Sequence, residues 1–165
     1  YITTTSDERG RKTVMELIEK ATPERVFPVG RLDRHTTGVL LFTNDGELAQ
    51  RLSHPSGKVK KVYQVTLDKE LSVEDMKKIA EGVELEDGIA AIDEIAFSHP
   101  TDNCIVGIEL HSGKNRIVRR IFELLGYRVI KLDRVLYAGL TKKDVQRGKW
   151  RFLKPQEIIL LKRQT

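Results

Sequence analysis

The sequence predicts a mixed α/β domain of the α+β kind, in which a largely antiparallel sheet is flanked by helices. Segments with the two-residue alternation of strands come in runs, and a few amphipathic stretches separate them instead of alternating strictly with them. The length of 165 residues and the hydrophobic share of 39% suit a compact domain with one sizeable core. We therefore expect a single domain over residues 1–165.

The first third of the chain predicts a short helix, a strand and a second helix. Thr13 and Glu16 have the spacing of a capping box, and apolar residues then recur at helical intervals until Pro23. The continuous apolar run 39–42 predicts a buried strand that ends in a turn. Asn44 is then expected to cap a helix that carries Leu48 and Leu52.

The middle of the chain predicts strands around one helix. Alternation over residues 61–67 predicts a strand, Ser72 opens a helix, and Gly82 lies just past its end. A turn at residues 86–88 leads to strand-like segments 89–97 and 104–110. The single cysteine, Cys104, is expected at a buried strand position, and it excludes an internal disulfide and a thiolate metal cluster.

The last third predicts an amphipathic helix followed by short strands. The apolar stripe consists of Ile117, Ile121, Leu124 and Leu125 and closes at Gly126. The opposite face holds Arg116, Arg119, Arg120 and Glu123. Strand candidates follow at residues 129–132, 135–137 and 150–153, and the pattern ends near Pro155.

Charge and composition narrow the function classes. The 29 Lys and Arg residues outnumber the 24 Asp and Glu residues, and the resulting net charge of +5 favours a polyanionic partner. The four histidines are scattered without the close spacing of zinc motifs, so we expect no metal. No apolar run approaches the length of about 20 residues that crosses a bilayer, and no signal peptide opens the chain, so we expect a cytoplasmic protein without a membrane partner.

The segment 30–38 is the first candidate for chemistry. It places Asp33 between Arg31 and Arg34 in a turn-rich stretch, and nearby cations favour the ionised carboxylate that a nucleophile or charge stabiliser requires. A loop held together by a structural Asp–Arg ion pair has the same pattern. Spacing alone leaves both interpretations open.

Two further candidates lie downstream. The segment 113–120 places Arg116, Arg119 and Arg120 at a helix start, which suits phosphate or carboxylate groups, although a solvated cationic helix face has the same pattern. Tyr63, with Lys61 two residues before it on the same face of a strand, is either a core tyrosine or a platform on which an unstacked base lies.

These segments together resemble the RsuA/RluB group of RNA pseudouridine synthases. Gly30-Arg31-Leu32-Asp33, continued through residues 36–46, is similar to the signature segment of that family. The family's later motifs have counterparts, in the same order, at His54-Pro55 with residues 61–63, at residues 82–88 and at residues 113–120. The resemblance covers almost the whole chain.

The resemblance implies a role for each candidate. Asp33 matches the catalytic aspartate, Tyr63 the tyrosine that stacks against the target base, and Arg119 the basic residue that pairs with the aspartate. Arg31 matches an arginine associated with the RNA, and Leu32 is expected near the site. The RNA-binding set is Arg31, Arg34, Lys61, Arg116 and Arg120.

The implied reaction isomerises a uridine of ribosomal RNA to pseudouridine without any cofactor. The target uridine is flipped or already unpaired, because a stacked base is out of reach. The His54-Pro55-Ser56 segment and the Asn115-Arg116 form of the third motif resemble members that act on large-subunit ribosomal RNA. We expect a monomer.

Alternatives to this function remain open. One is a synthase that acts on small-subunit RNA, and another is a noncatalytic RNA-binding or ribosome-assembly module. A phosphoryl-transfer or nuclease domain would need clustered carboxylates for metal ions, and the signature segment has none beside Asp33. Family members usually carry an N-terminal S4-type RNA-binding domain that has no counterpart here, and only a remnant of the first motif is found at residues 1–5. We therefore expect a catalytic fragment.

Overall fold

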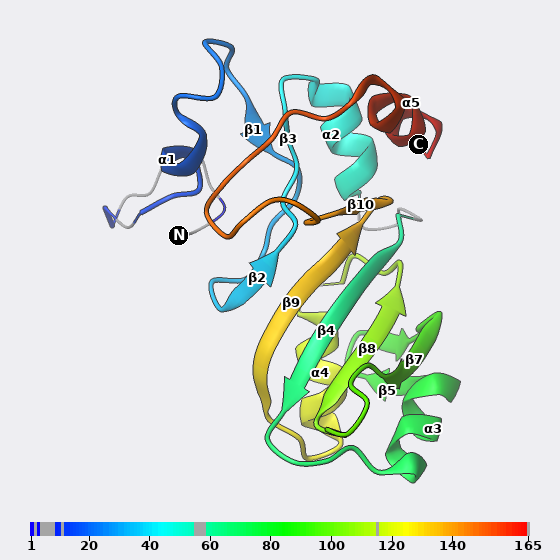
Figure 1. Cartoon of the computed structure of the whole chain (residues 1–165). Coiled ribbons are helices and arrows are strands. Elements are labelled where there is room, and N and C mark those ends of the chain that lie inside the picture. Colours follow the sequence, from blue (N-terminus) through cyan, green and yellow to red (C-terminus); the bar gives the residue numbers. More distant parts are fainter. Residues whose placement is uncertain (2, 4–8, 11, 55–58, 115, 165) are drawn as a thin grey trace.

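The chain folds around a six-stranded sheet. A computed structural model describes residues 1–165 except positions 2, 4–8, 11, 55–58, 115 and 165. The sheet has the order β10-β9-β4-β8-β7, and β2 pairs with β9 outside this path (Figure 1). Its strands are β2 (Thr36–Gly38), β4 (Lys61–Leu67), β7 (Glu94–Phe97), β8 (Ile105–Leu110), β9 (Val129–Tyr137) and β10 (Leu140–Thr141). Because only β2 and β9 run parallel, the predicted α+β fold with a largely antiparallel sheet is confirmed.

The first of two hydrophobic clusters lies on the central strands. It joins buried side chains of β4, β8 and β9 to those of α3 (Val73–Glu81), α4 (Ile117–Leu124), β5 (Val83–Leu85) and β6 (Gly88–Ala90). The predicted start of a helix at Ser72 and its predicted end before Gly82 are both found here. The Ser72 hydroxyl accepts a hydrogen bond from the Asp75 amide at 3.1 Å, and Gly82 ends α3 with a φ of +103°.

The second cluster lies at the other end of the molecule. Its core contains Val29, Leu41 and the buried residues of α2 (Gly46–Ser53). These pack with Tyr137 of β9, Leu140 of β10 and Leu161 of the last helix, α5 (Pro155–Arg163). A two-stranded ribbon of β1 (Phe27–Pro28) and β3 (Phe42–Thr43) lies beside α2, and α1 (Met15–Ile18) lies beyond it (Figure 1). The helices of the two clusters, α3 and α4 for the first and α2 and α5 for the second, lie toward opposite ends of the view in Figure 1, with β2 between them.

Predictions for the first third of the chain were wrong in detail. The Thr13 capping box does not form, because helix α1 is four residues long and no side chain caps it. The run 39–42 is not one strand, because the Val39 amide and carbonyl both bind Arg134 and the chain leaves the sheet there; β3 begins only at Phe42. Helix α2 is capped by Asp45 instead of Asn44, since the Asp45 carboxylate accepts from the Leu48 amide at 3.1 Å.

Predictions for the later segments need four corrections. Cys104 lies in a turn before β8 and is half-buried. Residues 89–97 form two strands, with a break at 91–93, and the separate candidates 129–132 and 135–137 are one strand, β9. Residues 150–153 are not a strand, and helix α5 follows them.

Helix α4 turns its faces differently from the expected stripe. Leu124 is 55% exposed, while Val118 and Phe122 fill the core in its place. Arg119 is only 8% exposed, so it does not belong to a solvated face. Predictions that fall on Thr4, Thr5, Pro55, Ser56 and Asn115 lie outside the described residues. Within the described part of the chain, no helix has the length and hydropathy that a membrane crossing requires.

Candidate active site

The loop between β1 and β2 presents Asp33 at the junction of the two clusters. The Asp33 carbonyl accepts a hydrogen bond from the Thr36 amide at 2.8 Å, which closes a turn at the entry to β2. The Thr3 hydroxyl bonds both to the Leu32 carbonyl at 3.1 Å and to the Leu32 amide at 3.2 Å. Strand β2 then pairs in parallel with β9, from Thr36 opposite Leu132 to Gly38 opposite Arg134. The loop is therefore anchored on both sides of the carboxylate.

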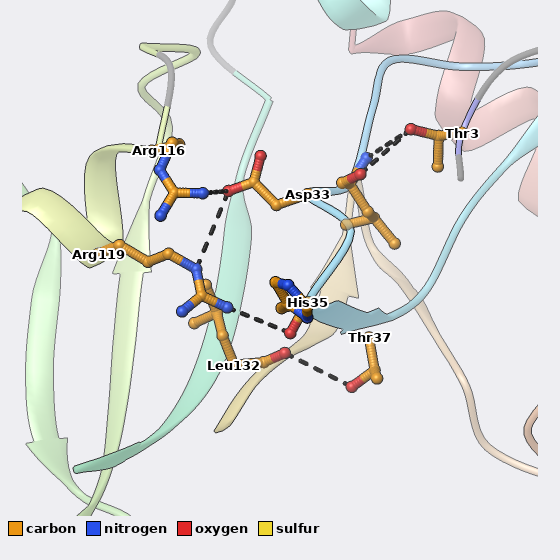
Figure 2. Close-up of polar contacts among 8 residues, drawn as sticks. Thr3, Asp33, His35, Thr37, Arg116, Arg119 and Leu132 are labelled. Carbon is orange, nitrogen blue, oxygen red and sulfur yellow. Dashed lines mark hydrogen bonds and ion pairs between the residues drawn. The ribbon is translucent and has the colours of Figure 1, made fainter. Parts of the chain in front are cut away.

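Helix α4 supplies two guanidinium groups to this carboxylate (Figure 2). Arg116 Nη1 lies 3.1 Å from Asp33 Oδ2, and Arg119 Nε lies 3.9 Å from the same oxygen. Arg119 Nη2 also donates to the His35 carbonyl at 3.1 Å, so its side chain bridges the helix to the loop. The Arg119 side chain is 10% exposed and that of Asp33 is 31% exposed. A nearly buried cation thus faces a carboxylate that solvent can still reach.

The contact between Arg119 and Asp33 is incomplete as a hydrogen bond. Within the described residues, the buried Arg119 Nε has no hydrogen-bond partner, because 3.9 Å is an ion-pair distance only. An unmade hydrogen bond to a buried donor costs about 1–3 kcal/mol. Catalytic contacts often tighten only when the substrate is bound. The distance of 3.9 Å is therefore compatible with a catalytic contact between Arg119 and Asp33.

Arg116 holds its position at the cost of backbone strain. Its φ of +51° is in the left-handed region, which a residue with a side chain rarely adopts. Such strain costs about 1–3 kcal/mol and concentrates at functional sites. The strained residue is the N-cap of α4 and ion-pairs with Asp33. The strained backbone conformation thus places the Arg116 guanidinium against the Asp33 carboxylate.

Tyr63 approaches the same region from β4. It pairs with Ile108 of β8 on one side and with Arg134 of β9 on the other, and it packs against the first cluster. Burial raises the pKa of the Tyr63 phenol, the Arg134 guanidinium opposes this rise, and the Asp33 carboxylate adds to it. The Arg134 guanidinium and the Asp33 carboxylate thus act on the pKa of the same phenol in opposite directions.

The remaining predicted residues lie at different distances from the chemistry. Lys61 is half-buried and donates to the Ser112 carbonyl at 3.1 Å, and burial followed by the charge of Arg134 lowers its pKa. Arg120 faces away, because it forms two hydrogen bonds with the Asp87 carboxylate, at 2.9 and 3.2 Å, and these lower the pKa of Asp87. Arg31 and Arg34 are exposed beside Asp33.

Arg134 is the functional candidate that the sequence reasoning missed. It is 3% exposed, and its Nε and Nη2 donate to the Val39 carbonyl at 2.9 and 2.6 Å. A signal did exist, because Arg134 follows Leu132 by two residues and therefore shares its inward face of the strand. An arginine at an inward strand position needs an explanation.

A second polar group and a cleft border the site. Thr37 Oγ1 donates to Asp133 Oδ1 at 2.9 Å, and Lys142 pairs with the other oxygen of the same carboxylate. Asp33 and Arg34 line part of a cleft of about 810 Å³ between β2 and the segment 140–153. Among the residues that the structure describes, no three His, Cys, Asp or Glu side chains gather as metal ligands would.

Comparison with known proteins identifies similar sequences over most of the chain. The family described as RNA pseudouridylate synthase matches residues 1–124. An uncharacterized RNA pseudouridine synthase of Aquifex aeolicus is 41% identical over 92% of this chain and 61% of its own length. The ribosomal large subunit pseudouridine synthase B of Bacillus subtilis is 37% identical over 98% of this chain and 67% of its own length.

The fold has a counterpart among solved structures. The crystal structure of a pseudouridylate synthase superposes with a TM-score of 0.83 and 25% identity, covering 97% of this chain and 68% of that one. The chain thus spans between 61% and 68% of the lengths of these three proteins.

Proposed function

The chain belongs to the RNA pseudouridylate synthase family, and we propose that it isomerises a uridine of ribosomal RNA to pseudouridine. The proposal rests on one observation above all, the Asp33 carboxylate with Arg116 at 3.1 Å and Arg119 at 3.9 Å. The name of the Bacillus subtilis relative supports large-subunit RNA as the substrate class. Net charge +5 is consistent with a polyanionic substrate.

The reaction is an isomerisation, so the product has the same composition as the substrate, although one hydrogen exchanges with solvent. The bond between N1 of the base and C1′ of the ribose breaks, the uracil turns, and C5 bonds to C1′. N1 gains a proton and C5 loses one, so no oxidant or reductant is required. A carboxylate can promote this by attack on the base, by attack on C1′ or by assisting glycal formation, and each route requires Asp33 to be ionised. Two guanidinium groups lie beside this carboxylate, Arg116 Nη1 at 3.1 Å and Arg119 Nε at 3.9 Å.

Arg119 has the geometry of a charge stabiliser. Its Nη2 is fixed on the His35 carbonyl while its Nε faces Asp33, so its cation cannot swing away from the carboxylate. Preorganised charge in a water-poor site stabilises charge that develops in the transition state. Arg119 is therefore assigned to hold the carboxylate, and Arg116, which is more exposed, to contact the RNA as well.

The target base is proposed to lie on Tyr63. An aromatic ring holds an unstacked base, and a uridine has to leave its helix before a carboxylate can reach it. Arg31, Arg34, Lys61, Arg116 and Arg120 are proposed to bind the phosphates around it. Arg120 would do so only after exchange with Asp87, which makes it the weakest member of this set.

The test is release of tritium from ribosomal RNA transcripts labelled at C5 of uridine, in the presence of a chelator. Asp33→Asn should lower turnover by at least about 1,000-fold, because the nucleophilic or stabilising charge is gone, while RNA affinity stays within about threefold. Asp144→Asn is the matched control, since Asp144 is an exposed aspartate with a φ of +64° that asparagine also tolerates. Turnover retained by Asp33→Asn would overturn the assignment.

A further inference from the structure

Arg134 is a buried cation that connects the two hydrophobic clusters. Its guanidinium carbon lies 4.3 Å from the centre of the Tyr137 ring, which belongs to the second cluster. Its strand partner Tyr63 packs against the first cluster. Among the described residues, no carboxylate forms an ion pair with Arg134. The cation is therefore held by the Val39 carbonyl and by the face of the Tyr137 ring.

Burying the Arg134 charge costs more free energy than burying a residue that only fills the core would. The effective penalty for removing a charge from water is several kcal/mol, and a buried cation without an anionic partner recovers only part of it. An apolar residue at position 134 would continue the inward row that Leu132 begins. The retained guanidinium therefore points to a requirement for its charge or its donors.

Arg134 contacts or pairs with both elements that present the proposed site residues, Asp33 and Tyr63. Its Nε and Nη2 donate to the Val39 carbonyl, one residue beyond the strand β2 that carries the Asp33 turn. Its backbone carbonyl accepts from the Val39 amide at 2.9 Å. On the neighbouring strand, Tyr63 is the register partner of Arg134, and the Arg134 charge opposes the rise that burial causes in the pKa of the Tyr63 phenol.

We propose that Arg134 is a positioning residue for the isomerisation, which holds Tyr63 on β4 in place relative to the β2 crossing and keeps a positive charge next to its strand partner Tyr63. The reaction named here rests on the proposed function, whereas the effect on Tyr63 does not. With 3% exposure, Arg134 is too deeply buried to bind phosphate, so it acts through Tyr63 and the β2 crossing.

The electrostatic consequence has a definite sign. Burial raises the pKa of Tyr63, and Arg134 is the group that opposes the rise most. The other charged or titratable groups near this pair are Asp33, Tyr137 and Lys61. Removing the guanidinium leaves burial and the Asp33 charge unopposed, so the pKa of Tyr63 rises further.

The experiment follows the ionisation of Tyr63 directly. The protein is produced with 3-fluorotyrosine, whose phenol ionises at lower pH than tyrosine, and the Tyr63 signal in ¹⁹F NMR is assigned with Tyr63→Phe. Arg134→Met should raise the pKa of Tyr63 by about one unit or more, the size of effect that a close opposite charge has. Arg134→Lys should restore most of the shift. Arg128→Met is the matched control, because Arg128 is an exposed arginine directly before β9. This change should leave the Tyr63 signal at the same pKa as in the parent.

Tritium release supplies the second readout. Arg134→Met should lower kcat by about 100-fold, the cost of a misplaced target base on Tyr63, while KM for RNA stays within about twofold. If Arg134→Met does not fold, Arg134→Lys carries the test, with the pKa of Tyr63 close to that of the parent and kcat reduced about tenfold because lysine lacks the planar fork. An unchanged pKa in folded Arg134→Met, or a kcat unchanged in both variants, would overturn the proposal. The NMR titration needs no turnover. A parent protein that releases no tritium would therefore refute the proposed function but would leave the effect of Arg134 on Tyr63 testable.

Discussion

The two hydrophobic clusters differ in how regularly they are built, and the candidate site lies where they meet. In the first cluster, the central strands β4, β8 and β9 are six to nine residues long, and β8 carries a buried side chain at every second position from Val106 to Leu110. In the second cluster, the ribbon β1 and β3 has strands of only two residues, and much of the core comes from helix α2 and from loops. Regular structure fixes a side chain more tightly than a loop does.

The division of labour at the site follows from this difference. The part of the chain built around the first cluster, here called the first region, supplies the Tyr63 ring from β4 and the Arg116 and Arg119 cations from α4 and its N-cap. The part built around the second cluster is called the second region. The loop that leaves the second region supplies Asp33. The 3.9 Å separation between Arg119 and Asp33 therefore reports how the two regions sit against each other. A change in either region should reach the site through that distance.

The largest effect is expected where β2 pairs with β9, with Gly38 opposite Arg134, because this pairing joins the two regions. Gly38→Ala places a methyl group 2.2 Å from the Arg134 carbonyl oxygen, at a φ of +122°, so the free energy of unfolding should fall by more than about 4 kcal/mol. Denaturant unfolding measures it. Gly126→Ala is the matched control, because a Cβ there meets nothing within 4 Å at a φ of +88° and should cost only about 1–2 kcal/mol. Equal losses in both variants would mean that β2 does not lock the regions.

Equivalent truncations in the two cores test whether they unfold together. Leu110→Ala, in the first cluster at 0% exposure, should cost about 4 kcal/mol, and Leu52→Ala, in the second at 1% exposure, about 3 kcal/mol. The smaller value follows because α2 and the loops around Leu52 can relax into the cavity. Fluorescence and circular dichroism should give coincident transitions for both. Separate transitions in Leu52→Ala would show two folding units.

Sequence patterns predicted the regular region better than the irregular one, for a physical reason. The strand at 61–67, the Ser72 cap and the stop at Gly82 depend on local periodicity and capping, which the chain itself encodes. The ribbon β1 and β3 has no period to detect at two residues per strand, and the break after Gly38 depends on contact with Arg134, 96 positions along the chain. Tertiary contacts decide such segments.

The site shows the same division. Spacing alone left Asp33 between a catalytic and a structural interpretation, and only the resemblance to a family selected Arg119 as its partner. Helical periodicity could not show that Arg119 is buried while Arg120 turns to Asp87, because that choice depends on β5 and its following turn. The effect of Arg134 on Tyr63 required the strand register.

A smaller effect is expected where a buried phenol ties two helices of the first region. The Tyr127 hydroxyl donates to Asp75 Oδ2 at 2.7 Å and accepts from the Ser72 amide at 3.2 Å, so it joins the start of α3 to the end of α4. Tyr127→Phe should lower the free energy of unfolding by about 1–2 kcal/mol, because the ring stays packed while its hydrogen bonds are lost. Tritium release should be unchanged. A loss of turnover would show that strain in the first region alone reaches the site.

The smallest effect is expected at α5, which closes the second region. The Glu157 carboxylate bonds to the Arg151 guanidinium at 2.7 and 2.8 Å and to the Lys154 amide at 2.8 Å, and these bonds lower the pKa of Glu157 from 4.5 to about 2. A carboxylate with a lowered pKa stabilises the fold fully above its unfolded value of 4.5, and this contribution is lost as the pH falls towards 2. The Tm of Glu157→Gln should therefore lie below that of the parent near neutral pH, and the gap should close between pH 4.5 and 2. Glu74→Gln, in the first turn of α3, is the matched control from the first region. A gap that stays constant across this pH range would mean that α5 is held by the apolar contacts of Leu161, and not by the charge at its first turn.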